Sequence, residues 1–257
     1  MTGLVGLSTF GGRAEILLNR PLKRNSLTFE MLFEIEKILK CISIDKGIRV
    51  VVISGVGNFC SGADLIEFGS LTSERVSNEW IPLGNRILNF IENLPVPVIA
   101  KITGPTLGGG LELALACDIR ISDGTGKFGL PESKVGAIPG WGGIRRLSRD
   151  IGMAKAKYLV LTGEVIDADR AFEWGIISGI VENNEIDYEL VKICSLIESG
   201  SPLSLKLSKQ MFSLLNTNFS ELESSDKNMA NQSFRSKEFQ EGLSAFREKR
   251  PPKFIST

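Results

Sequence analysis

The stretch 103–118 reads TGPTLGGGLELALACD and carries an acid where the sequence otherwise predicts a buried helix. Residues 111–117 are apolar apart from Glu112, and a segment that is apolar on all sides is typical of a helix inside a core. A buried carboxylate is costly unless it has a partner or a task. Glu112 lies about one turn into this helix, where free backbone N–H groups favour negative charge. It is therefore either a functional acid or a cap of its own helix.

Two other polar segments are candidates for a site. Glu132 directly follows a proline in the loop 128–136, where an exposed surface acid is the common interpretation. The turn 19–26 contains three basic residues, which suit either a solvated loop or a site for an anion such as phosphate. Position in the sequence leaves both alternatives open.

The absence of histidine restricts the chemistry more than any other feature of the composition. It excludes Ser-His and Cys-His catalysis, HExxH zinc sites and haem ligation by histidine. Acid–base chemistry must therefore use Glu, Asp, Lys, Tyr or Cys in an environment that tunes the pKa. The four cysteines are far apart and never form CxxC, so we expect buried small residues in a reducing compartment and no metal site.

The elements around these residues alternate between strands and helices. A hairpin is expected from two apolar runs on either side of Gly11 and Gly12, followed by a helix that Thr28 caps and a buried strand over 49–54. The glycine-rich loop 55–65 follows that strand, and Asp64 can start the next helical stretch. Loops at strand ends are common ligand sites in α/β proteins. A helix over 73–93, interrupted near Trp80, precedes a strand over 96–102.

The second half of the chain is mostly helical. A strand over 118–122 and a glycine turn at 138–143 precede a helix rich in arginine, with further helices at 153–162 and 167–174. After a short extended piece at 176–181, we expect four helices, over 186–199, 201–214, 219–231 and 236–249. The sequence thus predicts an α/β fold with two parts: a core over 1–195 and a C-terminal helical region over 196–257.

The 257 residues are enough for one large or two small domains. Lysine plus arginine equals aspartate plus glutamate at 30 each, and this net charge of zero disfavours a nucleic-acid partner. No apolar run approaches the roughly 20 residues that span a bilayer, and the first ten residues show no targeting signal. We therefore expect a cytoplasmic protein without a membrane partner.

Five motifs together resemble the crotonase superfamily, the enoyl-CoA hydratase/isomerase family, over nearly the whole chain. They are FCSGADL at 59–65, GGGLEL at 108–113, FGLPE at 128–132, GAIPGWGG at 136–143 and EGLSAFREKR at 241–250. Each motif alone is weak, whereas five in order are specific for the family. The resemblance implies a crotonase-like ββα spiral core with a C-terminal trimerisation region, as a homotrimer or a dimer of trimers.

The resemblance also assigns roles to individual residues. The backbone amides of Ala63 and Gly109 would form an oxyanion hole for a thioester carbonyl. Glu112 would mainly hold and activate water, and Glu132 would mainly deliver a proton, although coupled carboxylates can share these roles. The substrate would be an acyl-CoA, with no cofactor besides the CoA it carries.

The expected CoA-binding residues, besides Ala63, are Lys23, Arg24, Asn25, Asp64, Leu65, Phe246 and Lys249, the last two reaching the CoA of a neighbouring subunit. The expected acyl-pocket residues are Phe68, Trp80, Ile81 and Trp141. Trp141 occupies a position that is often small in the family, so it narrows the expected pocket. Thr103 and Pro105 also depart from the family pattern.

The two glutamates favour hydration of a 2-enoyl-CoA to a 3-hydroxyacyl-CoA. Alternatives within the family are Δ3-Δ2 enoyl-CoA isomerisation, which needs chiefly one acid, and another acyl-CoA lyase reaction such as the reverse dehydration. A different class of function is RNA binding, which some relatives have. The zero net charge and the lack of a long basic stripe argue against it.

Overall fold

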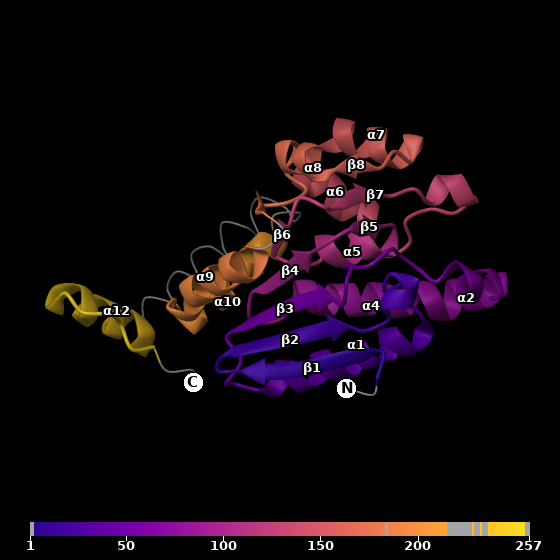
Figure 1. The fold of residues 1–257 in the computed structure, drawn as a ribbon. Helices are drawn as coiled ribbons and strands as arrows, with labels where there is room; N and C mark the ends of the chain where they lie inside the picture. Colours follow the sequence, from indigo (N-terminus) through magenta and orange to yellow (C-terminus); the bar gives the residue numbers. More distant parts are fainter. Residues whose placement is uncertain (1–2, 183–184, 215–227, 229–231, 233–235, 255–257) are drawn as a thin grey trace.

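A six-stranded sheet forms the centre of the chain in the computed structural model, which describes residues 3–182, 185–214, 228, 232 and 236–254 (Figure 1). In spatial order its strands are β1 (Val5–Phe10), β2 (Arg13–Leu18), β3 (Val50–Gly55), β4 (Val98–Ile102), β6 (Ile119–Ser122) and β9 (Gly179–Ile180). The β1–β2 hairpin is antiparallel and the other four pairings are parallel. The predicted hairpin and the strands over 49–54, 96–102 and 118–122 are confirmed, each with slightly shifted ends.

Helices cover both faces of this sheet. On one face, α1 (Phe29–Ile44) and α4 (Ile81–Glu92) bury apolar side chains in the main core, which also contains Val51 and Ile53 of β3. On the other face, α9 (Ile186–Glu198) packs on the alternate residues Val50 and Val52. Burial on both faces explains why β3 is apolar throughout. Thr28 caps α1 as expected, its side chain accepting a hydrogen bond from the backbone N–H of Met31.

A second sheet of three short strands was not predicted. It consists of β5 (Pro105–Leu107), β7 (Lys127–Gly129) and β8 (Ile166–Asp167), with β7 in the middle. Strands of two or three residues show too little alternation to be recognised, and their partners are distant in the sequence. This sheet determines where the chain turns into α5 (Gly109–Leu115), the fully buried helix that carries Glu112.

The remaining elements surround α5 and the loop after β3. They are η1 (Pro21–Lys23), α2 (Leu65–Gly69), α3 (Ser73–Arg75), the π-helical turn η2 (Val76–Trp80), the 3-10 turn η3 (Glu132–Val135), α6 (Gly143–Ile151), α7 (Met153–Thr162) and α8 (Ala168–Trp174). Asp64 caps α2 as predicted. The expected interruption near Trp80 is the π-helical turn η2, after which the chain continues directly into α4.

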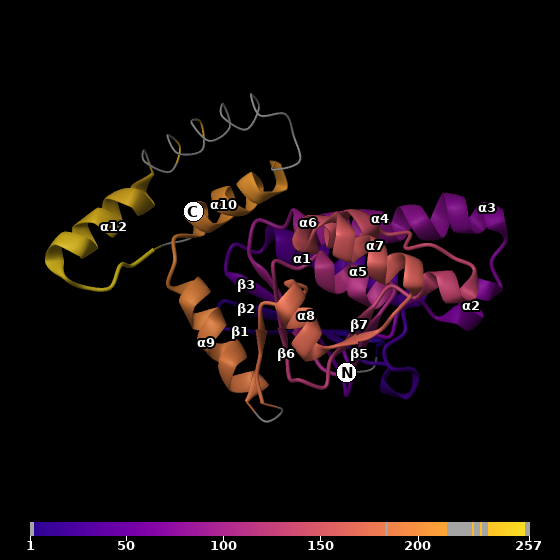
Figure 2. The ribbon, with the colours of Figure 1, turned by 90° about the horizontal axis from the view of Figure 1, so that it is seen from above.

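Of the last helices of the chain, one is tied to the core through Lys209 and the other stands apart from the sheets (Figure 2). Helices α10 (Pro202–Leu214) and α12 (Lys237–Glu248) follow α9, and α12 lies at the end of the molecule opposite α2 in both views (Figures 1 and 2). The boundary expected after residue 195 falls inside α9, and the division of the chain into a core and a C-terminal region stays a prediction. The helix expected over 219–231 lies outside the described residues. None of the described helices has the length and apolar character needed to cross a membrane.

Three of the four cysteines are buried, as expected, but Cys41 is exposed on α1. Its position between buried residues of the helix stripe made it look like part of the core, and the helix instead turns it outward. Burial raises the pKa of the Cys60 and Cys117 thiols to about 12, so both are protonated and inert at neutral pH.

Candidate active site

The two predicted acids open onto one cavity. Glu112 comes from α5 and Glu132 from η3, and both line a space of about 80 Å³. The other lining residues are Ala63, Leu65, Phe68, Trp80, Ile81, Gly109, Val135, Ala137, Ile138, Gly140 and Trp141. The surface-acid interpretation of Glu132 is therefore wrong, because a loop that looked featureless in the sequence brings this carboxylate to the buried helix.

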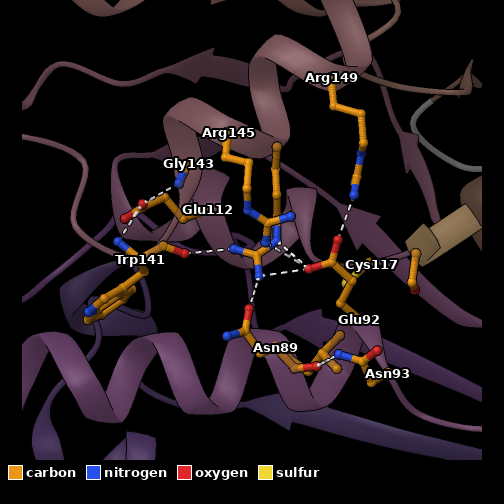
Figure 3. Close-up of polar contacts among 12 residues, drawn as sticks. Asn89, Glu92, Asn93, Glu112, Cys117, Trp141, Gly143, Arg145 and Arg149 are labelled. Carbon is orange, nitrogen blue, oxygen red and sulfur yellow. Dashed lines mark hydrogen bonds and ion pairs between the residues drawn. The ribbon is translucent and has the colours of Figure 1, made fainter. Parts of the chain in front are cut away.

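Glu112 is 2% exposed and bound through one of its oxygens (Figure 3). Its Oε1 accepts hydrogen bonds from the backbone N–H of Trp141 at 2.7 Å and of Gly143 at 2.8 Å. Gly143 is the first residue of α6, whose N-cap Gly142 has no capping side chain. Glu112 therefore caps α6 and not its own helix. Because both amides reach Oε1, Oε2 is the oxygen left to exchange a proton.

Burial is the main influence on the pKa of Glu112, which it raises to about 7. The amides of Gly143 and Trp141 act in the opposite direction, and the negative charge of Glu132 raises the pKa further. A carboxyl with a pKa near neutrality is suited to general acid–base catalysis, because it can both accept and return a proton. This environment is the kind that allows a carboxylate to replace histidine.

Glu132 is half-buried and less constrained. Its Oε2 atom is buried and has no hydrogen-bond partner among the described residues, and burial raises the pKa of this carboxyl as well. A buried oxygen without a partner normally requires an explanation, such as a catalytic role or a bound molecule. Glu132 therefore has an oxygen available to a ligand in the same cavity as Glu112.

Two residues that line this cavity, Ala63 and Gly109, have backbone amides without an acceptor in the described part of the chain. Gly109 is the first residue of α5, so its N–H has no partner within the helix. Neither this amide nor that of Ala63 donates to another described residue. The loop before α2 lies tightly against the start of α5, since a Cβ atom on Gly110 would lie 2.1 Å from the backbone oxygen of Cys60. Only glycine permits this approach, and it places Ala63 and Gly109 on the wall of one cavity.

Aromatic side chains close the inner end of the cavity. All four expected acyl-pocket residues line it, and the rings of Trp80 and Trp141 are 5.2 Å apart. The indole of Trp141 lies against Gly84 and Gly109, where any Cβ atom would lie within 2.6 Å of it. Its Nε1 donates to the backbone oxygen of Trp80 at 3.3 Å. Sequence analysis did not identify four further lining residues, Val135, Ala137, Ile138 and Gly140, as contacts of the pocket.

A wider cavity of about 460 Å³ continues outward from the small one. The two share Ala63, Leu65, Gly109, Glu132 and Val135, so they form one cleft. Its outer part is lined by Lys23, as expected for a phosphate-binding residue, and by Lys134, which sequence analysis missed. The cleft thus runs from lysines at its mouth to aromatic rings at its inner end.

Three residues expected to contact CoA have other contacts. The Asn25 side chain is fully buried, accepts a hydrogen bond from the N–H of Arg20 and donates to the backbone of loop 56–58, so its amide cannot reach a ligand. Arg24 is exposed but does not line the cleft. The Asp64 carboxylate lines the cleft, yet it caps α2 and pairs with Arg20 at 2.6 Å. The turn 19–26 is therefore largely a structural unit, with Lys23 at the cleft.

The two expected residues of the C-terminal segment lie far from the cleft of their own chain. Lys249 is exposed and directly follows α12, on the opposite side of the molecule from α2 (Figures 1 and 2). Phe246 is in α12, and its side chain lies outside the described part. Contact between these residues and the CoA of a neighbouring subunit stays a prediction.

A cavity of about 480 Å³ lies elsewhere, between α10 and the segment 116–120. Its lining includes Asp118, Lys209 and Phe212, whereas Glu112, Glu132, Ala63 and Gly109 are not among the described residues that line it. Lys209 pairs with Asp118 at 2.7 Å and donates to two backbone oxygens. These contacts bind α10 to the core beside the cavity. Size alone therefore does not identify the active site, whereas the convergence of acids and amides does.

Comparisons with known proteins identify the family and the fold. The model of the enoyl-CoA hydratase/isomerase family matches residues 10–257. A crotonyl-CoA hydratase of Syntrophomonas wolfei is 37% identical, covering 95% of this chain and 94% of its own. The rat mitochondrial methylglutaconyl-CoA hydratase is 38% identical, covering 92% of this chain and 77% of its own. The crystal structure of an enoyl-CoA hydratase from Bacillus anthracis superposes with a TM-score of 0.95 at 34% identity, covering 99% of this chain and all of that one. The chain therefore belongs to the enoyl-CoA hydratase/isomerase family, and its fold is the α/β crotonase fold.

Proposed function

We propose that this protein is a hydratase that adds water to a trans-2-enoyl-CoA and forms a 3-hydroxyacyl-CoA. The observation that carries the proposal is that Glu112 and Glu132 line one small cavity together with the free amides of Ala63 and Gly109. The family uses acyl-CoA substrates, and these four groups suit the addition of water to a thioester-activated double bond. The pair of acids supports hydration over reactions that need only one acid.

In the proposed reaction the thioester oxygen accepts hydrogen bonds from the amides of Ala63 and Gly109. Ionised Glu112 takes a proton from water as the water oxygen bonds to C3. The electron pair of the C2=C3 bond moves toward the thioester, giving an enolate that the two amides stabilise by about 3 kcal/mol each. The enolate then collapses and C2 takes a proton from Glu132. Glu112 then releases its proton to solvent, and Glu132 takes up a proton from solvent. The net change is the addition of one water.

The cavity favours short, uncharged acyl groups. Trp80 and Trp141 close its inner end, and a space of about 80 Å³ suits an acyl group of roughly four carbons. No lysine or arginine is among the described residues that line it. An acyl group with a distal carboxylate, as in methylglutaconyl-CoA, would bury an unpaired charge there. We therefore propose a substrate closer to crotonyl-CoA than to methylglutaconyl-CoA.

The test is turnover of crotonyl-CoA, followed as loss of the absorbance of the conjugated thioester, with a 3-enoyl-CoA as the alternative substrate. Hydratase activity predicts turnover of crotonyl-CoA, with losses of about 100-fold or more in both Glu112→Gln and Glu132→Gln. Both variants should still bind CoA thioesters. If Glu132→Gln is inactive while Glu112→Gln isomerises the 3-enoyl-CoA at the wild-type rate, the protein is an isomerase. Retention of RNA without turnover would support the RNA-binding alternative.

A further inference from the structure

Arg146 is a buried cation that has no part in the proposed steps. It lies on α6 with 1% of its side chain exposed, although a buried charge is costly unless it is fully paired. Its guanidinium joins Trp141, Asn89 and Glu92. Nη1 donates to the backbone oxygen of Trp141 at 2.6 Å, Nη2 to Oδ1 of Asn89 at 2.8 Å, and Nε to Oε2 of Glu92 at 3.0 Å.

The contact with Trp141 connects this cation to the active site. The carbonyl oxygen of Trp141 accepts from Arg146, while the N–H of the same residue donates to Oε1 of Glu112 (Figure 3). Gly142, between Trp141 and Gly143, has a φ of +84°, and a Cβ atom there would lie 2.8 Å from Nη1 of Arg146. The guanidinium therefore packs directly against the turn whose two amides hold Glu112.

We propose that Arg146 is a positioning residue for Glu112. By binding the Trp141 carbonyl, its guanidinium fixes the turn 141–143 and so the two amides that orient the Glu112 carboxylate. Glu92 and Asn89 at the end of α4 hold the guanidinium in turn, so α4, α6 and α5 form one connected support. This role rests on the proposed function, because it assumes that Glu112 exchanges a proton with water.

The positive charge of Arg146 favours the ionised form of Glu112, the same form that the two amides stabilise. The charged groups that influence Glu112 are Glu132, which raises its pKa, and Arg146, which lowers it. Burial would raise the pKa of Glu92, but the three arginines around it, Arg146, Arg149 and Arg145, hold it at about 2. Glu92 thus stays ionised at any working pH and keeps Arg146 in place. Loosening the turn should weaken the two amide hydrogen bonds and raise the pKa of Glu112.

The test compares Arg146→Lys with Arg145→Lys. Lysine keeps a positive charge near Glu92 but cannot reproduce the three-way fork of arginine. Arg145 is a matched control on the same helix, since it also pairs with Glu92, at 3.1 Å, but is half exposed and makes no contact with the turn. We expect Arg146→Lys to lower kcat by about 10- to 100-fold with little change in KM, and Arg145→Lys to change kcat by less than about twofold.

The pH profile separates positioning from general stability. Glu112 must be ionised to accept a proton, so a higher pKa moves the acidic limb of the profile to higher pH. We expect this shift in Arg146→Lys and not in Arg145→Lys. A folded Arg146→Lys enzyme with the wild-type kcat and acidic limb would overturn the proposal.

A second pair of variants covers the case in which Arg146→Lys does not fold. Asn89 is exposed, so Asn89→Ala removes one support of the guanidinium without leaving a buried charge. Asn93→Ala is its control, because the side-chain amide of Asn93 donates, within the described part of the chain, only to the backbone oxygen of Asn89. We expect a loss of kcat of several-fold in Asn89→Ala alone, about 3- to 10-fold. Equal kcat values and equal acidic limbs in the two variants would contradict the proposal.

A measurement without turnover keeps this inference separate from the proposed function. The infrared difference between the wild type and Glu112→Gln reports protonation of the Glu112 carboxyl in the free protein. The inference predicts a higher titration midpoint when the same difference is taken in the Asn89→Ala background. Wild-type protein that does not hydrate crotonyl-CoA, combined with a shifted midpoint, would refute the function and leave the positioning role standing. An unchanged midpoint combined with full hydratase activity would refute the positioning role and leave the proposed function standing.

Discussion

At the scale of single residues, the candidate active site depends on the carboxylate of Glu112, which backbone hydrogen bonds hold in place without an ion pair among the described residues. Glu112 is almost fully buried, yet the only hydrogen bonds of its carboxylate among the described residues come from two backbone amides, both to one oxygen. In the same part of the chain no lysine or arginine forms an ion pair with it. A carboxyl in this setting keeps a pKa near 7, at a cost in free energy of folding.

This cost gives a prediction about stability. The pKa of Glu112 is raised from 4.5 to about 7 in the folded state, so the folded protein binds more protons than the unfolded chain between these values. Stability therefore falls as pH rises through that window, by roughly 3 kcal/mol in total. Glu112→Gln keeps an oxygen that can cap α6 but does not ionise. We expect this variant to gain stability relative to the wild type at pH 8 but much less at pH 5.

Urea unfolding at both pH values measures the effect, with Glu30→Gln, an exposed acid in the first turn of α1, as the control. A difference between Glu112→Gln and the wild type that is equal at both pH values would show that Glu112 ionises normally in the folded protein.

At the scale of elements, the acyl pocket is built where η2, α4 and the turn before α6 meet. Trp141 reaches across from that turn and packs on Gly84 of α4 and Gly109 of α5. The contact is possible only because both helices carry glycine there. The indole therefore forms a wall of the cavity, and we propose that it limits the length of the acyl group.

Shortening this side chain should change chain-length preference. We expect Trp141→Phe to raise kcat/KM for 2-hexenoyl-CoA relative to crotonyl-CoA by about 10-fold, as one or two methylenes are accommodated. The backbone amide that holds Glu112 is unchanged by this substitution. Trp174→Phe is the matched control, because Trp174 lies on α8 beside Tyr158 and does not line the cleft. An unchanged preference in Trp141→Phe would show that another residue sets the limit.

Elements with long patterns could be predicted from the sequence, and those that depend on tertiary contact could not. The helix stripe of α1 and the buried run of β3 have local signals, and so has the apolar helix α5 around its single acid. Strands β5, β7 and β8 have two or three residues each and exist only because their partners meet in space. The same reason hides Lys134 and the burial of Asn25, since neither has a local pattern.

The site shows the same division. Glu112 could be suspected from its own helix, whereas Glu132 resembled a surface acid until the family motifs were considered together. Its burial arises because η3 packs against α7 and lines one cavity with α5, which no local pattern encodes. That Glu112 caps α6 and not its own helix could not be predicted, because α6 is 31 residues away at Gly143.

At the scale of the whole molecule, the cleft has two ends of different character. Lys23 and Lys134 lie at the outer end and aromatic rings at the inner end, as a CoA thioester would require.

We expect Lys23→Gln and Lys134→Gln each to raise KM for crotonyl-CoA by about 2- to 5-fold, since both lysines are exposed. KM for crotonyl-pantetheine, which lacks the nucleotide phosphates, should not change. Lys37→Gln, on the outer face of α1, is the control, and an equal effect on both substrates would exclude a phosphate contact.

The C-terminal helices provide a prediction about assembly. Leu196 and Phe212 are 66% and 68% exposed, although both are large and apolar, and α12 stands apart from the sheets (Figure 2). Large apolar side chains that are exposed in the single chain favour self-association. We propose a trimer or a dimer of trimers, with a mass three or six times the 28.1 kDa of the chain. Light scattering after size-exclusion chromatography measures it, and a monomer at micromolar concentration would contradict it.

The central claim is that two carboxylates act as one unit on one water molecule. The most direct test is the rate of crotonyl-CoA hydration by Glu112→Gln, Glu132→Gln and the double variant, compared as a cycle. Groups that act together are not additive, so we predict that the double variant is about as slow as the slower single variant. Losses that multiply in the double variant, or a single variant with the wild-type rate, would contradict the claim.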